Sequence, residues 1–287
     1  MAEGKTYIRA SSTSGYGDCA RRWAASNLKR ELEAAGFDDL NESMPQSIGA
    51  GVGTAVHSGA GYMMMQKLQT GALGNETEAA QRALQEIDEA AARGVLWDKE
   101  TANKNDAQKQ TLRMVAMFRH DAAPLLEPSA VERRLQADVG DGFVVTGQSD
   151  LQVISPIGVD DLKTGKRATR HFGQIGSYSL LARTEHPGLQ VKRLRTIFLQ
   201  RVPLRVPQPV VVYEEYPQDV AEQAAWAAIG RIKQDVAEFR RRVIEGDAPP
   251  EHAFLANPNS NLCSPKFCKA WGTKFCREYR KQPNQED

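Results

Sequence analysis

The amino-acid sequence predicts a mixed α/β protein in which helices flank a central mixed sheet. Helical periodicity occupies the first 125 residues, strand-like alternation begins near residue 130, and a helix, two strands and a closing helix follow. The 287 residues are 41% hydrophobic and 25% charged, which is typical of a globular protein, and we expect one domain over 1–287. No apolar run approaches the roughly 20 residues that cross a bilayer, and the first residues do not resemble a secretory signal. We therefore expect a cytoplasmic protein with no membrane partner.

Four helices are expected in the N-terminal region, which contains amphipathic segments and one segment rich in small residues. In the first of them, Trp23, Leu28 and Leu32 recur at helical spacing. A helix made largely of small residues follows Pro45, and two amphipathic patterns come after it. The expected helical ranges are 17–36, 46–68, 76–94 and 105–120.

The second half of the chain alternates strands and helices. Gly140-Asp141-Gly142 separates two apolar runs and indicates a tight turn between strands, and 155–158 indicates a second turn. A long amphipathic pattern then ends before Pro249-Pro250. The expected strands are 131–137, 143–154, 159–164, 191–202 and 209–214, and the expected helices are 173–184 and 218–245.

Basic residues are concentrated although the net charge is only +1. The stretch 162–213 is rich in Lys and Arg, and Glu185 is its one acidic residue. Such segregation favours a surface that binds a polyanion, although a solvated face is the simpler alternative for charge alone. The candidate residues of such a polyanion-binding surface are Lys166, Arg167, Arg170, Arg193 and Arg195.

The segment 146–166 carries the pattern with the clearest chemistry. Asp161 and Lys163 are two residues apart on a predicted strand, so both side chains leave the same face. Asp150 lies on the preceding predicted strand. If the two strands form a hairpin, Asp150 lies beside Asp161. Two carboxylates and a lysine in this arrangement can form an oxygen-rich site for Mg²⁺ or Mn²⁺ next to an attacking water.

Two further patterns flank this segment. Gln174 and Tyr178 are spaced i, i+4 on the predicted helix 173–184, so both side chains face one side. His57 ends the run Gly53-Thr54-Ala55-Val56-His57 inside the small-residue helix, where a core histidine is the structural alternative.

Taken in order, Gly-Thr-x-x-His, Gly-x-x-Asp, Asp-x-Lys-Thr-Gly and Gln-x-x-x-Tyr resemble the RecB-type nucleases of the PD-(D/E)XK superfamily. The resemblance implies a restriction-endonuclease-like core over about 46–247. It also implies that His57, Asp150, Asp161 and the backbone carbonyl of Leu162 hold the metal ion. A histidine ligand favours Mn²⁺ over Mg²⁺.

The same resemblance implies roles for the other matched residues. Lys163 is expected to orient the attacking water and to stabilise charge on the scissile phosphate, whereas Gln174 and Tyr178 contact DNA and support the site. Glu132 stands where many relatives carry a further acid, and a solvated strand residue is its alternative. Asp160 departs from the family, because relatives have an apolar residue there, and strand alternation directs it away from Lys163.

The four cysteines follow a one-plus-three layout: Cys19, then Cys263, Cys268 and Cys276. This layout is similar to the iron–sulfur branch of the family, which includes the AddB nuclease domain and CRISPR-adaptation exonucleases, and it implies a 4Fe–4S cluster. Segments 15–36 and 254–280 would then form a clasp. Relatives have two residues between the second and third cysteines where this chain has four, so structural Zn²⁺ is an alternative, and four unrelated thiols are another.

The sequence therefore predicts a metal-dependent DNA exonuclease acting on single-stranded ends in recombination, repair or phage DNA processing. A DNA endonuclease and a catalytically silent DNA-binding or scaffold subunit are the alternatives. The sequence contains no Gly-x-x-x-x-Gly-Lys-Ser/Thr motif, so strand separation would need a helicase or recombination partner protein.

Overall fold

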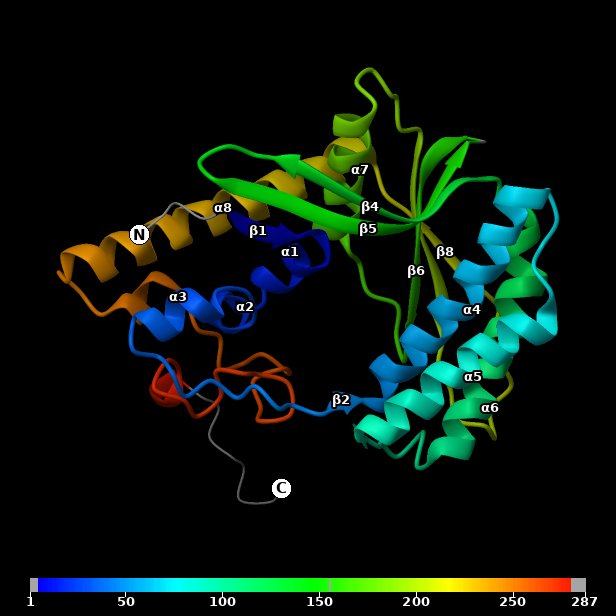
Figure 1. The fold of residues 1–287 in the computed structure, drawn as a ribbon, viewed down its shortest axis with the longest axis horizontal. Coiled ribbons are helices and arrows are strands. Elements are labelled where there is room, and N and C mark those ends of the chain that lie inside the picture. The colour runs from blue at the N-terminus through cyan, green and yellow to red at the C-terminus, as the bar shows by residue number, and fades with distance from the viewer. Residues whose placement is uncertain (1–4, 155, 280–287) are drawn as a thin grey trace. The chain divides into compact units, whose positions relative to one another are not determined.

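The computed structural model describes residues 5–154 and 156–279 (Figure 1). Its contacts divide the chain into two compact units, each assembled from separate stretches of sequence. The first unit is drawn from 1–44, 136–146 and 223–287, and the second from 45–135 and 147–222. The second unit lies within the expected core 46–247 apart from Pro45. Both expected clasp segments lie in the first unit, except that residue 280 is outside the described residues.

Three helices of the second unit pack against one another: α4 (Ile48–Thr70), α5 (Glu76–Arg93) and α6 (Lys104–Met117) (Figure 1). The Ser47 hydroxyl accepts a hydrogen bond from the Ala50 N–H and caps the start of α4, and Gly71 ends that helix in the left-handed conformation. Buried apolar side chains fill the space between the helices, among them Val56, Met63 and Ile87. Helix α6 continues into a π-helical turn (Phe118–Ala122) and a 3-10 turn (Ala123–Leu125).

The second unit also contains most of a mixed sheet. Strand β5 pairs antiparallel with β6, β6 pairs parallel with β7, and β7 pairs antiparallel with β8, while β4 also pairs with β5. Helix α7 (Phe172–Glu185) makes the crossover that the parallel pair requires. A two-residue pairing of β2 (Gln46–Ser47) with β3 (Val95–Leu96) is separate from this sheet. The sheet strands are β4 (Pro128–Asp138), β5 (Phe143–Ile154), β6 (Ile157–Gly165), β7 (Arg193–Gln200) and β8 (Val212–Glu215).

The first unit contains segments from the N-terminal and the C-terminal parts of the chain. Strand β1 (Thr6–Arg9) pairs parallel with the first residues of β5. Arg21 is almost fully buried and donates hydrogen bonds to the carbonyls of Glu251, Phe254 and Phe275. Its helices are α1 (Ala10–Tyr16), α2 (Ala20–Asn27), α3 (Lys29–Ala34) and most of α8 (Gln218–Glu245), followed by 3-10 turns at Pro250–Ala253 and Arg277–Tyr279.

The predicted fold class is confirmed, and the expected bounds of α8 coincide with the observed ones. The single helix expected over 17–36 was wrong: α2 begins after Cys19, and Leu28 leaves the helical conformation (φ −117°, ψ 31°) before α3. The sequence analysis also missed β1, because four residues are too short to display strand alternation. Within the described residues, no helix is long and apolar enough to span a membrane.

Candidate active site

Asp161 and Lys163 project from the same face of β6. The Lys163 Nζ lies 2.7 Å from the Asp161 Oδ2, and the Asp161 side chain is only 2% exposed. Strand alternation explains the pairing, because residues two apart share a face. Although this oxygen is fully buried and close to Lys163, it accepts no well-aligned hydrogen bond from the described residues.

Asp150 enters the same site from β5. Its Oδ2 accepts a hydrogen bond of 2.7 Å from the Leu162 N–H, so the carboxylate binds the backbone of the neighbouring strand directly. Its Oδ1 lies 3.2 Å from the Nδ1 of His57, which comes from α4. The structure therefore brings together Asp150, Asp161, Lys163 and His57, and it places the Leu162 backbone beside them.

Helix α4 crosses the strands along one row of residues spaced four apart: Gly49, Gly53, His57 and Gly61. A Cβ on Gly49 would lie 3.3 Å from the Arg201 guanidinium, one on Gly53 2.8 Å from the Thr164 hydroxyl, and one on Gly61 2.7 Å from the Glu132 carboxylate. Residues at this spacing face one direction on a helix. Small residues in this row thus permit the close approach that lets His57 reach Asp150.

Helix α7 supports the site through Gln174 and Tyr178, both buried. The Gln174 side-chain amide donates to the Asp161 Oδ1 at 3.3 Å and to the Tyr178 hydroxyl at 3.1 Å. Between them, Gly176 packs against the backbone of Ala221, where a Cβ would come within 1.8 Å of the Ala221 carbonyl oxygen. Gln174 and Tyr178 face the same side of α7, as their spacing predicted. The absence of a side chain at Gly176 lets α7 pack closely against the backbone of α8.

Burial and the neighbouring charges set opposite titration behaviour for the two carboxylates. Burial and the charge of Asp150 raise the pKa of Asp161 to about 6, although Lys163 opposes the rise. Burial alone would raise the pKa of Asp150, but the charge and hydrogen bond of His57 lower it. Burial disfavours the charged form of His57, and the two aspartates nevertheless raise its pKa.

These residues fit a divalent cation, although no three His, Cys, Asp or Glu side chains in the described ranges stand in a ready-made metal-binding arrangement. Protein groups currently occupy most of the carboxylate oxygens, since His57 and Leu162 bind Asp150 while Gln174 binds Asp161. The buried Asp161 Oδ2 retains capacity to accept, and burial together with the charge of Asp150 disfavours the ionised form of Asp161, so the site would gain from additional positive charge. A divalent cation with oxygen and imidazole ligands would supply that charge.

An open cleft of about 610 Å³ borders the site on the His57 side. Glu132 of β4 stands in its wall with φ at 50°, a left-handed conformation that is uncommon for a residue other than glycine. Burial and the charge of Asp150 raise the pKa of Glu132, and His57 opposes the rise. Glu132, the candidate additional acid, therefore lies within electrostatic range of His57 and Asp150, and its carboxylate packs against Gly61 of α4.

The five candidate DNA-binding residues fall into two groups. Lys166, Arg167 and Arg170 lie on the exposed segment after β6. Lys166 pairs with Asp98 and Glu100, Arg170 pairs with Glu214 at 2.8 Å, and Arg167 has no ion pair with any described residue.

Arg193 and Arg195 form the second group, and their side chains are largely buried. Both bind the fully buried Asp160, at 2.7 and 3.0 Å, and their side chains are 11% and 13% exposed. Asp160 alternates with Asp161 along β6 and therefore faces away from Lys163, as predicted. The basic character of this stretch partly reflects an internal ion-pair cluster, which charge counting along a sequence does not distinguish from a binding surface.

The four cysteines gather in the first unit. Burial, together with the charges of Cys276, Cys19 and Cys263, raises the pKa of Cys268 to about 11, although a hydrogen bond with the Ala270 backbone opposes the rise. Burial also raises the pKa of Cys276, which the nearby Arg21 opposes. A thiol must lose its proton to bind a metal, so a bound metal or cluster would displace those protons, but the described cysteines do not stand in a ready-made metal-binding arrangement.

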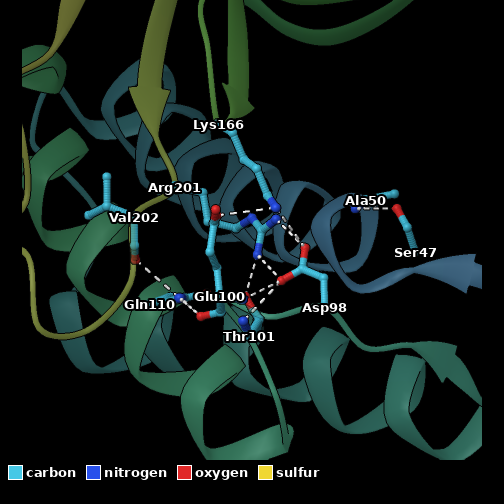
Figure 2. Close-up of polar contacts among 9 residues, drawn as sticks. All are labelled: Ser47, Ala50, Asp98, Glu100, Thr101, Gln110, Lys166, Arg201 and Val202. Atoms are coloured by element: carbon cyan, nitrogen blue, oxygen red, sulfur yellow. Dashed lines mark hydrogen bonds and ion pairs between the residues drawn. The ribbon is translucent and has the colours of Figure 1, made fainter. Parts of the chain in front are cut away.

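The sequence analysis missed the partners that hold Lys166. Asp98 and Glu100 lie in the loop between β3 and α6, far from Lys166 in the sequence, and no periodicity connects them. The buried Arg201 binds the same loop through Asp98 and Thr101 (Figure 2).

Two comparisons with known proteins gave matches, one with a protein family and one with a solved structure. The family model of the PD-(D/E)XK nuclease superfamily matches residues 9–272. A crystal structure from Eubacterium rectale, described as a "Putative exonuclease", is similar over 90% of this chain and 87% of that chain, with a TM-score of 0.56 and 11% sequence identity, which shows a shared fold. The search of curated proteins found no match. Because the family match covers most of the sequence, the chain belongs to the PD-(D/E)XK nuclease superfamily.

Proposed function

We propose that this nuclease is a metal-dependent DNA exonuclease that hydrolyses phosphodiester bonds at single-stranded ends. The observation that carries the proposal is the convergence of Asp150, Asp161 and Lys163 of the sheet with His57 of α4. A silent binding subunit would have no need for a lysine held at a buried metal carboxylate. Recombination, repair and phage DNA processing are processes that use such an activity.

Each side chain has a distinct part in the proposed reaction. Asp150, Asp161, His57 and the Leu162 carbonyl would hold Mg²⁺ or Mn²⁺, which activates water and stabilises the leaving oxygen. Lys163 Nζ, already beside Asp161, orients the attacking water and stabilises charge on the phosphate. Gln174 and Tyr178 keep Asp161 in place.

The exonuclease assignment draws on the description of the Eubacterium rectale structure. Digestion of end-labelled single-stranded and double-stranded DNA with Mn²⁺, with circular single-stranded DNA alongside, tests it. We expect linear single strands to yield mononucleotides or short products, and we expect the circular DNA to remain uncut. Cut circles would identify an endonuclease, and no cleavage of any substrate would identify a silent DNA-binding subunit. Cleavage of duplex ends only after addition of a helicase would support a partner protein that separates strands.

We further propose that Cys19, Cys263, Cys268 and Cys276 hold a 4Fe–4S cluster that clasps the two ends of the chain, with Zn²⁺ as the alternative occupant. The mutual effect of the four thiols within one unit supports this proposal. Protein purified without oxygen should be brown, with broad absorption near roughly 400 nm from thiolate-bound iron. One zinc per colourless chain would support the alternative, and four thiols that alkylate readily in the metal-replete protein would contradict both.

A further inference from the structure

Lys166 directly follows β6, the strand that carries Asp161 and Lys163. Its Nζ lies 3.4 Å from the Asp98 Oδ2 and 3.3 Å from the Glu100 Oε2, as Figure 2 shows. The Lys166 side chain is 46% exposed. Three residues of chain span at most about 10 Å, so the Lys166 backbone lies close to that of Lys163, and a DNA strand held at Lys163 comes within reach of the long Lys166 side chain.

Asp98 is neutralised without Lys166. The buried Arg201 donates to its Oδ1 at 3.4 Å and to its Oδ2 at 2.7 Å. The backbone N–H groups of Glu100 and Thr101 each donate to the Oδ1 at 3.0 Å. Burial would raise the pKa of Asp98, but the Arg201 hydrogen bonds and charge lower it to about 2. The Arg201–Asp98 pair is therefore a structural anchor for the loop (Figure 2).

Glu100 differs from Asp98 in this respect. Among the described residues, Lys166 is the ion-pair partner of its carboxylate, which is 32% exposed. Exposed ion pairs change an equilibrium by no more than about fivefold, so a phosphate can replace Glu100 as the partner of Lys166. Asp98 would keep its charge balance through Arg201 during that exchange.

We propose that Glu100 competes with DNA phosphate for Lys166 and thereby limits how tightly the protein binds DNA beside the cleavage site. Lys166 and the neighbouring Arg167, which has no ion pair with a described residue, form the phosphate-binding surface. This inference rests on the proposed action on DNA and specifies one surface for it. Glu100 thus lowers the affinity for a bound strand by the free energy of its own ion pair with Lys166.

The test measures the affinity for a fluorescein-labelled oligothymidylate by anisotropy, in EDTA and over a range of salt concentrations. Glu100→Gln should bind about two- to fivefold more tightly than wild type at low salt, because Lys166 becomes available. The slope of log affinity against log salt should steepen by about 0.7, the value for one additional single-strand phosphate contact. Lys166→Ala should bind more weakly than wild type, and Glu100→Gln/Lys166→Ala should match Lys166→Ala.

Glu89→Gln is the matched control, because Glu89 forms a comparable exposed ion pair with Arg93 on α5. It removes the same charge and should leave the affinity near that of wild type. An equal gain in Glu89→Gln, a gain from Glu100→Gln that persists without Lys166, or no gain at all would overturn the competition. Wild-type protein that binds no DNA would overturn the proposed function as well, so the two failures are distinct. Unchanged melting temperatures would show that each variant is folded.

Discussion

The catalytic role proposed for Lys163 can be separated from folding, because its partner Asp161 can become neutral by taking up a proton. The pKa of Asp161 is already about 6, so this carboxyl can take up a proton when the lysine is removed. We expect Lys163→Ala to reduce single-turnover DNA cleavage in Mn²⁺ by roughly 10²- to 10⁴-fold while the protein stays folded. Lys104→Ala, which removes an exposed lysine paired with Asp88, is the control and should cleave normally. Wild-type cleavage by Lys163→Ala would contradict the assigned site.

The raised pKa of Asp161 also predicts how stability depends on pH without metal. Its usual value is 3.8, and burial beside Asp150 raises it to about 6 in the folded protein. A raised pKa favours folding at low pH, so this contribution is present below about pH 4 and is lost as the pH rises through 6. In EDTA, wild type should lose on the order of 2 kcal/mol relative to Asp161→Asn between those values.

Urea denaturation of both proteins across this pH range measures the difference. Mn²⁺ should restore the lost stability of wild type above pH 6 and leave Asp161→Asn almost unchanged, because the variant lacks a charged ligand. Equal pH profiles for the two proteins would show that Asp161 does not carry the excess negative charge.

At the scale of elements, the distance between α4 and β6 depends on Gly53. A methyl group there would lie 2.8 Å from the Thr164 hydroxyl, so Gly53→Ala should push α4 and His57 away from Asp150. We expect cleavage to fall at least tenfold, with a smaller effect on melting temperature. Removing the obstructing hydroxyl in Gly53→Ala/Thr164→Ala should recover part of the activity, as kinetic assays of the two variants would measure.

Gly230→Ala provides the matched comparison for this substitution. Gly230 lies within α8, and nothing stands within 4 Å of a Cβ placed there. Alanine favours helices over glycine by about 1 kcal/mol, so Gly230→Ala should be neutral or stabilising. If Gly53→Ala behaved in the same way, close approach at Gly53 would not be what positions the histidine.

The elements also show what sequence patterns can and cannot predict. Periodicity within one segment was enough to predict α8 and the shared face of Asp161 and Lys163, because both depend on neighbours in the chain. The contact of His57 with Asp150 followed only from a family resemblance, since it joins a helix to a distant strand. The capture of Arg193 and Arg195 by Asp160 was not predictable from charge counts, which contain no information about burial.

At the scale of the whole molecule, the residues proposed to cleave DNA and the cysteines belong to different units. The first unit also has a metal-independent tie between the chain ends, because Arg21 binds three carbonyls of the C-terminal segment. Arg21→Ala would leave those buried acceptors without their donor, and we expect a loss of about 3 kcal/mol or more of unfolding free energy. Arg21→Lys should recover little, since one ammonium does not reproduce the planar guanidinium fork.

Hydrogen exchange read by mass spectrometry locates the effect. Protection in Arg21→Ala should fall within 5–44, 136–146 and 223–279 and persist in the second unit. Arg30→Ala, at an exposed position on α3, is the control and should retain wild-type protection. Loss of protection spread evenly over both units would mean that the chain unfolds as one cooperative body.

The row of Gly49, Gly53, His57 and Gly61 on α4 has a consequence for how this sequence can diverge. Each member meets a side chain from a different strand or strand end, in the order Arg201, Thr164, Asp150 and Glu132. Inserting or deleting one residue between Gly49 and Gly61 would rotate the remainder of the row by about 100° and break the later contacts together. Outward-facing positions of α4 can therefore change identity, whereas its length cannot change, and viable insertions should collect in the loops around it instead.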